Sequence, residues 1–294
     1  MSVDPERLAG RARVHRLRIE DVRCVWREWG AGAPVVLVHG GTGSWLHWVR
    51  NIDGLAASCR VLVPDLAGFG DSSDAPPGLG AAGQARLLLA GLRELLDADA
   101  SPAIVGFSFG AIVGGLAAAQ ADFPVRGLMI VGAVGLGIER GPPLPMRAWK
   151  HLDGEPEAVA QAHRHNLATL MLARTESVDP LAMEVQRRNA AAARFYSKRT
   201  SHSGALAQAL PRVRAPVAGV WGSEDVTAGR DPARIAARLR ALRPDASLDI
   251  IRGAGHWVQF EAAASFDAAC QGWLARLSCA DGLALAPPNR RTDR

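Results

Sequence analysis

Short uninterrupted runs of aliphatic residues recur along the chain, and helical stretches lie between them. The runs cover residues 35–38, 61–63, 103–105, 128–131 and 217–220. An unbroken run of this kind is typical of a strand that is covered on both faces. Residues 84–96 carry leucines at spacings of three and four, and residues 109–120 are small and apolar, which suits helices packed on a sheet. The alternation predicts an α/β fold with a mostly parallel central sheet flanked by helices.

Two shorter strands are expected before these aliphatic runs, at residues 12–19 and 22–29. Apolar residues alternate with arginines in the first segment and cluster in the second. Gly30 to Pro34 follow as a break, because proline cannot donate a hydrogen bond within a central ladder. These segments belong to the first part of the predicted core, which we place at residues 1–140.

The alternation stops between residues 141 and 211, where no convincing buried strand is found. This interval contains several prolines and two helix-like stretches, around residues 155–172 and 179–196. We interpret it as a helical cap or lid, inserted before the strand that carries the candidate catalytic acid. Core residues 212–280 follow, and residues 281–294, rich in proline and arginine, are expected to form a flexible tail.

Composition excludes several classes of protein and partner. Hydrophobic residues make up 48% and charged residues 21% of the 294 residues, which excludes disordered, collagen-like and disulfide-framework proteins. The net charge is +5, but no basic block is interleaved with aromatic residues, so no nucleic-acid partner is expected. The four cysteines form no C-x-x-C pair and the histidines no H-E-x-x-H pattern, so we predict neither a metal site nor a cofactor.

Apolar runs in the sequence bear on where the protein is found in the cell. No apolar run reaches about 18 residues, and no apolar segment follows the first charged residues, so neither a membrane span nor a signal peptide is expected. We therefore expect a cytoplasmic protein with reduced thiols. The oligomeric state cannot be inferred from the sequence.

The strongest chemical signal is Gly106-Phe107-Ser108-Phe109-Gly110, between a predicted strand and a predicted helix. The pattern G-x-S-x-G in that context is a nucleophile elbow, a sharp turn that presents the serine hydroxyl above the edge of the sheet. Glycines are needed there because side chains would collide across the turn. Ser108 is therefore the candidate nucleophile.

A serine hydroxyl needs a base, and the base needs an orienting acid. His256 lies on a loop after the apolar run at residues 248–251, and Asp225 follows the strand at residues 217–220. The chain order Ser108, Asp225, His256 is that of the α/β-hydrolases, and all three positions fall at the carboxyl edge of the sheet. In this interpretation His256 accepts the serine proton and Asp225 fixes its tautomer. Glu224 is the competing candidate for the acid. Alternatively, it is a solvated residue beside Asp225.

The oxyanion of an acyl-transfer reaction needs backbone N–H donors. His39-Gly40-Gly41 ends a strand in flexible glycines, so we assign one donor to Gly41 and the other to Phe109, directly after the nucleophile. His39 is either a second base or a structural residue that orders the glycine loop.

These motifs together resemble the α/β-hydrolase superfamily across about residues 20–278. The resemblance rests on residues 39–41, the segment Pro64-Asp65-Leu66-Ala67-Gly68-Phe69-Gly70-Asp71-Ser72, the elbow at Ser108, Asp225, and Gly255-His256. It implies the α/β-hydrolase fold, with the lid described above and a hydrolytic activity.

Within the superfamily, three stretches are similar to the meta-cleavage-product C–C hydrolases: residues 45–51, residues 65–72 and His256-Trp257-Val258-Gln259-Phe260-Glu261. That resemblance implies a pocket role for Trp257 and a lid arginine that binds a substrate carboxylate, with Arg187 and Arg188 as candidates. The chain departs from the pattern at Phe107, where some members carry asparagine before the nucleophile, and at His47, which replaces a second pocket asparagine. Phe107, Trp45, Trp48 and Trp257 point either to an apolar pocket or to core packing.

The sequence thus predicts a serine hydrolase that acts through an acyl-enzyme on a small ester or lactone with an apolar or aromatic acyl part. The alternatives are a C–C hydrolase of 2-hydroxy-6-oxo-dienoates, a non-catalytic ligand-binding protein of the same fold, and a cofactor-free haloperoxidase or acyltransferase. Each takes a small molecule as its partner.

Overall fold

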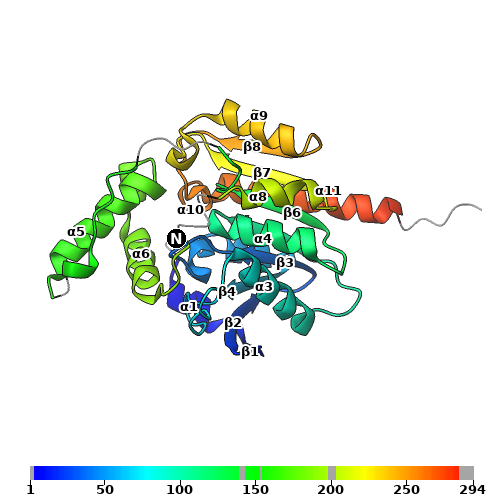
Figure 1. Cartoon of the computed structure of the whole chain (residues 1–294), viewed down its shortest axis with the longest axis horizontal. Coiled ribbons are helices and arrows are strands. Elements are labelled where there is room, and N and C mark those ends of the chain that lie inside the picture. The colour runs from blue at the N-terminus through cyan, green and yellow to red at the C-terminus, as the bar shows by residue number, and fades with distance from the viewer. Residues whose placement is uncertain (1–2, 139–142, 153, 198–202, 285–294) are drawn as a thin grey trace, which may run out of the picture.

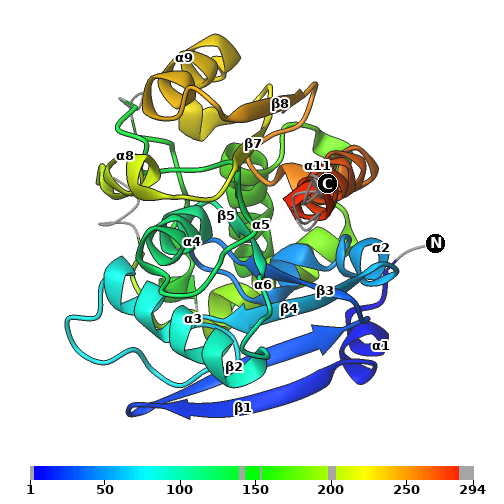
Figure 2. The same cartoon turned by 90° about the vertical axis from the view of Figure 1, so that its right-hand side faces the viewer.

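One eight-stranded sheet organises the chain, in the order β1-β2-β4-β3-β5-β6-β7-β8 (Figures 1 and 2). The computed structural model describes residues 3–138, 143–152, 154–197 and 203–284. The strands are β1 (Arg13–Ile19), β2 (Val22–Trp29), β3 (Ala33–Val38), β4 (Cys59–Asp65), β5 (Ala103–Phe107), β6 (Gly127–Val131), β7 (Val217–Gly222) and β8 (Ser247–Ile251). The pairs β1–β2 and β2–β4 are antiparallel and the others are parallel, so the predicted mostly parallel sheet is confirmed.

Pro34 lies inside β3, which differs from the predicted break at residues 30–34. It pairs with Arg60 of β4, whereas the ladder between β3 and β5 begins only at Val35. Proline is tolerated there because it stands near the start of β3, before the strand forms its hydrogen bonds with β5.

Helices cover both faces of the sheet. They are α1 (Pro5–Gly10), α2 (Ile52–Ala56), α3 (Ala81–Leu95), α4 (Phe109–Gln120), α5 (Pro156–Asn166), α6 (Pro180–Ala192), α8 (Ala205–Ala209), α9 (Pro232–Leu242), α10 (Val258–Glu261) and α11 (Ala263–Ala284). In Figure 2, α3, α4 and α8 lie on one side of the sheet and α1, α2 and α11 on the other. The predicted helix at residues 109–120 coincides with α4, and that at 84–96 is α3.

The core is correspondingly divided into two layers by the sheet. Along β3, Val36 and Val38 pack in the layer of α3 and α4, while Val35 and Leu37 pack in the layer of α2 and α11. All four side chains are fully buried. A strand covered on both faces has to be apolar at every position, which explains its uninterrupted run.

The interval between β6 and β7 contains α5 and α6, which stand beside the sheet (Figure 1). The predicted helical stretch at 155–172 is divided, because α5 ends at Asn166 and a π-helical turn, Leu167–Met171, follows. We refer to residues 167–174 as the lid turn. The predicted lid boundary at residue 141 lies outside the described residues.

The polar start of the chain forms α1, which the sequence analysis did not predict. Asp4 caps it by accepting hydrogen bonds from the N–H groups of Glu6 and Arg7, and Pro5 occupies its first position. At the other end α11 continues to Ala284, into the predicted tail; residues 285–294 lie outside the described part. Among the helices described, none has the length and apolar character needed to cross a membrane.

Candidate active site

Ser108 lies between β5 and α4 in a conformation that serine rarely adopts, with φ of 52° and ψ of −112°. The turn is closed by its N–H, which donates to the carbonyl of Val131 at 2.9 Å. A Cβ atom at Gly106 would lie 2.7 Å from Cα of Ala111, and one at Gly110 would lie 2.5 Å from the carbonyl oxygen of His39. Both flanking glycines are therefore required by close backbone contacts, as the elbow pattern predicts.

The structure brings Ser108, His256 and Asp225 together in one hydrogen-bonded chain. The serine Oγ lies 3.0 Å from Nε2 of His256, and Nδ1 of His256 lies 2.9 Å from Oδ2 of Asp225. They follow β5, β8 and β7, whose carboxyl ends share one edge of the sheet. Asp225 and His256 are buried, so this polar chain is held where water competes weakly for it.

Thr227 and Gly132, which sequence reasoning did not select, support this chain. The N–H and hydroxyl of Thr227 both donate to Oδ1 of Asp225, at 2.8 and 2.7 Å, and its Oγ1 lies 3.2 Å from Nδ1 of His256. A Cβ atom at Gly132, which has φ of +48°, would lie 3.2 Å from that same Nδ1 atom. A short polar residue two positions after a candidate acid is the sequence signal that indicates Thr227.

The two predicted oxyanion donors lie close together. A Cβ atom at Gly41 would lie 3.8 Å from Cβ of Phe109, and one at Gly40 would lie 3.2 Å from Cβ of Ser108. Phe109 is the first residue of α4, so its N–H has no partner within the helix. The glycine loop thus covers the elbow, with the N-terminus of α4 beside it.

The two histidines near this loop have different structural roles. His39 donates from Nδ1 to the carbonyl of Gly40 at 2.8 Å and accepts at Nε2 from the N–H of Leu66 at 3.0 Å. Both of its nitrogens are thereby occupied, which fits the structural alternative and leaves neither free to act as a base. Burial lowers the pKa of His39, which keeps the ring neutral at pH 7.

His47 holds the other side of the glycine loop. Its Nδ1 accepts the N–H of Gly40 at 3.2 Å, and its carbonyl accepts from the indole of Trp257 at 2.9 Å. Burial, with smaller effects from His39 and His256, holds the pKa of His47 well below its usual value. A neutral ring that accepts at Nδ1 carries its proton on Nε2.

Three predicted pocket residues form one aromatic cluster beside His256. Phe107 has its ring centroid 5.3 Å from that of His47 and 5.1 Å from that of His256, and Trp257 lies 5.2 Å from His47. Phe107 and Trp257 are each 1% exposed. These rings therefore pack around the histidines. Phe107 and Trp257 belong, like Trp45 and Trp48, to the buried core layer of α2 and α11, which fits the core-packing alternative.

The two candidate lid arginines make their contacts elsewhere. Arg187 pairs with Glu184 on the same helix, α6, and Arg188 pairs with Glu6 of α1. The structure shows no contact between either guanidinium and Ser108, Asp225 or His256 in the described residues. Glu224, the competing acid, accepts from the hydroxyl of Ser223 at 3.0 Å, whereas Asp225 contacts the histidine.

Glu261 joins the lid turn to the loop of His256. Its buried carboxylate accepts the N–H of Ala173 at 3.0 Å, that of Arg174 at 2.8 Å and that of Gly255 at 2.6 Å. The N–H of Trp257 also donates to the carbonyl of Met171 at 2.8 Å. The sequence motif that ends in Glu261 is thus a structural link between the lid and the histidine loop. Within the described ranges, no group of three or more His, Cys, Asp or Glu side chains is arranged to hold a metal ion.

Comparison with known proteins identifies the family. Residues 35–269 match the model of the alpha/beta hydrolase family. A 2-hydroxy-6-oxo-2,4-heptadienoate hydrolase of Pseudomonas putida is 30% identical over 247 residues, which is 79% of this chain and 85% of the relative. A 2-hydroxy-6-oxo-6-phenylhexa-2,4-dienoate hydrolase of Burkholderia cepacia is 29% identical over 81% of this chain and 86% of its own.

Solved structures share the fold. A serine hydrolase involved in carbazole degradation superposes with a TM-score of 0.70 at 21% identity, over 90% of this chain and 99% of the other. An esterase from Rhodococcus gives 0.69 at 20% identity, over 91% of this chain and 99% of the other. The family match and the curated relatives show that the chain belongs to the alpha/beta hydrolase family and support hydrolase activity, and the solved structures and the mostly parallel sheet show the α/β-hydrolase fold.

Proposed function

We propose that this protein is a serine hydrolase that cleaves small esters or lactones with an apolar or aromatic acyl part through an acyl-enzyme. The observation that carries the proposal is the continuous chain from Ser108 through His256 to Asp225, with distances of 3.0 and 2.9 Å. A nucleophile, a base and an orienting acid in hydrogen-bond contact are the elements of this chemistry.

In this proposal the reaction has two halves, acylation of Ser108 and hydrolysis of the acyl-enzyme. His256 Nε2 takes the hydroxyl proton while Ser108 Oγ forms a bond to the carbonyl carbon, and the carbonyl oxygen becomes an anion. The backbone N–H groups of Gly41 and Phe109 stabilise that anion, and His256 then returns the proton to the departing alkoxide. Water attacks the acyl-enzyme with His256 as base, which releases the acid and restores Ser108. Asp225 stabilises the imidazolium in both halves.

The apolar side chains near the nucleophile favour an apolar acyl part. Phe109, directly after the nucleophile, packs against Phe69 and the partly exposed Phe195, whereas Phe107 and Trp257 are buried against His47. In this proposal residues 141–211 act as a cap over the bound small molecule, and no cofactor takes part. A haloperoxidase or acyltransferase would use the same acyl-enzyme with an acceptor other than water.

A second candidate is C–C hydrolysis of a 2-hydroxy-6-oxo-dienoate, and it is favoured by the curated relatives of about 30% identity that carry this activity in their names. Phe107 and His47 stand where the resemblance implies asparagines, and Arg187 and Arg188 are paired with Glu184 and Glu6. The ester reaction requires none of these four side chains, and it therefore remains the leading proposal.

The test compares wild type and Ser108→Ala on p-nitrophenyl butyrate and on 2-hydroxy-6-oxo-hepta-2,4-dienoate. We expect ester turnover by wild type and a loss of at least about 10³-fold in kcat for Ser108→Ala. Ser101→Ala is the matched control, because its hydroxyl bonds to the carbonyl of Pro124 near the surface and to no other group among the described residues.

The outcomes separate the candidates. Dienoate turnover with a kcat/KM equal to or above that for the ester would replace the ester proposal with the C–C reaction. Full activity of Ser108→Ala, without labelling of the wild type by a fluorophosphonate, would refute both. Binding of the substrates without turnover would identify a non-catalytic ligand-binding protein.

A further inference from the structure

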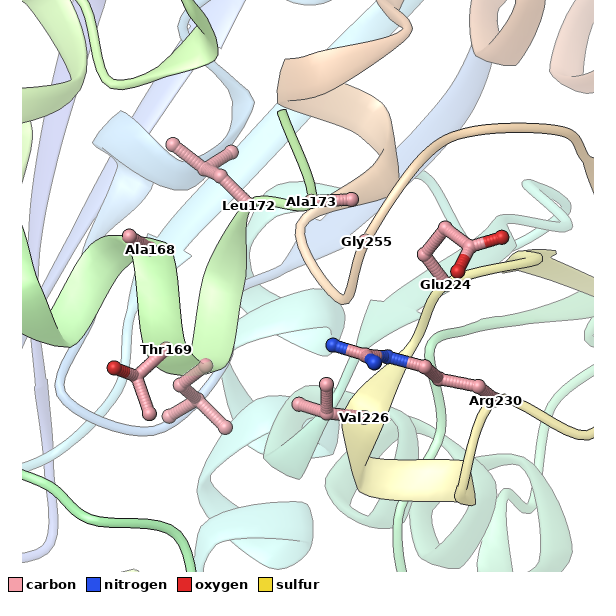
Figure 3. Close-up of a pocket in the computed structure, with 9 residues that line it drawn as sticks. Ala168, Thr169, Leu172, Ala173, Glu224, Val226, Arg230 and Gly255 are labelled. Carbon is pink, nitrogen blue, oxygen red and sulfur yellow. The ribbon is translucent and has the colours of Figure 1, made fainter. Parts of the chain in front are cut away.

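A cavity lies between the lid turn and the loops that follow β7 and β8 (Figure 3). Its volume is about 280 Å³, and its lining includes Thr169, Leu170 and Leu172 of the lid turn. From the core come Val226, directly after Asp225, and Gly255, directly before His256. Ser108, Asp225 and His256 are absent from its described lining, so the cavity adjoins the candidate active site without containing its reacting atoms.

Arg230 supplies a positive charge to this cavity. Figure 3 shows its guanidinium pointing toward the space between Thr169, Val226 and Gly255. No carboxylate of the described residues lies within ion-pair distance of that guanidinium, in contrast with the paired lid arginines Arg174 and Arg187.

The backbone of Arg230 is fixed, although its side chain has no ion-pair partner among the described residues. Its N–H donates to the carbonyl of Asp225 at 2.9 Å, which closes the loop from Asp225 to Arg230. Its φ of +54° follows a glycine at +73°, so two consecutive residues take the left-handed conformation. The backbone of Arg230 is therefore fixed in the same loop that carries the candidate acid, and its exposed side chain extends from that fixed position.

The lining defines the chemistry of a ligand. A guanidinium presents a planar fork of donors that matches a carboxylate, and the hydroxyl of Thr169 offers one more donor. Leu170 and Val226, which are partly exposed, offer limited apolar contact for a short carbon skeleton, whereas Leu172 is almost wholly buried. Glu224 also lines the cavity, and its carboxylate repels any anion, so the ligand's carboxylate is expected on the lid side of the Arg230 guanidinium and a dianion is disfavoured further.

We propose that this cavity binds a small organic monocarboxylate, with the carboxylate on Arg230 and the apolar part against Leu170 and Val226. The bound acid contacts the lid turn on one side and the loops of Asp225 and His256 on the other. It therefore holds the lid turn against the core. The site is separate from the proposed hydrolytic function, and binding to it requires no turnover.

Benzoate is the probe, and benzamide is its uncharged counterpart of nearly equal shape. Isothermal titration of the full-length protein should show benzoate binding that is at least about tenfold tighter than benzamide binding, which corresponds to about 1.4 kcal/mol. Arg230→Asn removes the charge and suits the left-handed backbone, since asparagine is enriched there. It should weaken benzoate binding at least about tenfold, while Arg234→Asn, an exposed arginine on α9, leaves it unchanged.

Two further measurements locate the probe. Benzoate should still bind after a fluorophosphonate has reacted with Ser108, or to Ser108→Ala if no reaction occurs. It should also slow amide hydrogen exchange of residues 167–174 in wild type and not in Arg230→Asn. Equal benzoate affinity of wild type and Arg230→Asn, loss of binding on modification of Ser108, or unchanged exchange in the lid turn would each overturn the site. None of these outcomes depends on ester or dienoate turnover.

Discussion

At the scale of single residues, the candidate site is held in place by contacts that leave no room for other atoms. Ser108 keeps a strained backbone because its N–H is bonded to Val131 and its neighbours Gly106 and Gly110 approach other backbone atoms closely. Gly132 approaches His256 in the same way, at the end of β6. The positions of the reacting groups therefore depend on the absence of a Cβ atom at Gly106, Gly110 and Gly132 as well as on the hydrogen bonds of the site.

Gly132→Ala is expected to lower kcat by about 10²-fold, because misplacement of a reacting group by about 1 Å has effects of this size. The added Cβ would lie 3.0 Å from the carbonyl oxygen and 3.2 Å from Nδ1 of His256. Gly78→Ala is the matched control, since Gly78 also has a positive φ, +76°, but no atom within 4 Å of the added Cβ. Both variants should lose about 1 kcal/mol of stability from the backbone alone. The kcat of both variants is measured with p-nitrophenyl butyrate. Equal kcat values for the two variants would contradict the expectation.

Thr227→Val should lower kcat by about tenfold with little change in KM. The substitution removes the hydroxyl that donates to Asp225 at 2.7 Å but keeps the backbone donor of Thr227 at 2.8 Å. Asp225→Asn removes the anion itself and should cost about 10⁴-fold. Steady-state kinetics of the two variants measure both effects. A loss for Thr227→Val as large as that for Asp225→Asn would mean that the threonine takes part in the reaction directly.

At the scale of elements, the lid turn and the histidine loop are joined by Glu261. One buried carboxylate accepts N–H groups from both segments, and the backbone of Trp257 adds a direct bond to the carbonyl of Met171. The π-helical turn at Leu167–Met171 follows α5 and leads directly to Ala173 and Arg174, whose N–H groups donate to Glu261. Movement of the lid turn is therefore coupled to the position of His256.

Glu261→Gln is expected to lower kcat/KM by about tenfold and stability by about 1–3 kcal/mol. A glutamine amide nitrogen cannot accept a hydrogen bond, so the N–H of Gly255 or of a lid residue is left without its partner. Glu176→Gln, an exposed lid glutamate, is the control. Ester kinetics and urea unfolding measure the two effects. A variant with wild-type kinetics and reduced stability would show that the link serves folding alone.

At the scale of the whole molecule, the sheet separates two core layers and brings distant segments to one edge. Residues 108, 225 and 256 meet because β5, β7 and β8 run parallel and end together. The partly buried Asp267 of α11 borders the layer of α2 and α11, and its Oδ1 accepts from Asn51 at 2.8 Å. Burial raises the pKa of Asp267 to about 6.

Because the folded pKa of Asp267 lies above its ordinary value of 3.8, the protonated form stabilises the native state. Its contribution is fully present below about pH 3.8 and is lost as the pH rises through about 6. Asp267→Asn should therefore raise the free energy of unfolding at pH 8 by about 1 kcal/mol and have little effect near pH 4. Urea unfolding at both pH values checks this, with exposed Asp249→Asn as the control. Equal effects of Asp267→Asn at pH 4 and pH 8 would contradict the assigned titration.

The sequence by itself determined the strands, the elbow and the chain order of Ser108, Asp225 and His256. These features are local: an unbroken aliphatic run, a G-x-S-x-G turn and a histidine loop each carry their signal within a few residues. Only the tertiary structure decided the partners of polar side chains. It paired Arg187 and Arg188 with glutamates, placed Glu261 between two loops and left Arg230 in a cavity. Such partners come from segments far apart in the chain, and their meeting depends on how helices and loops pack around the sheet.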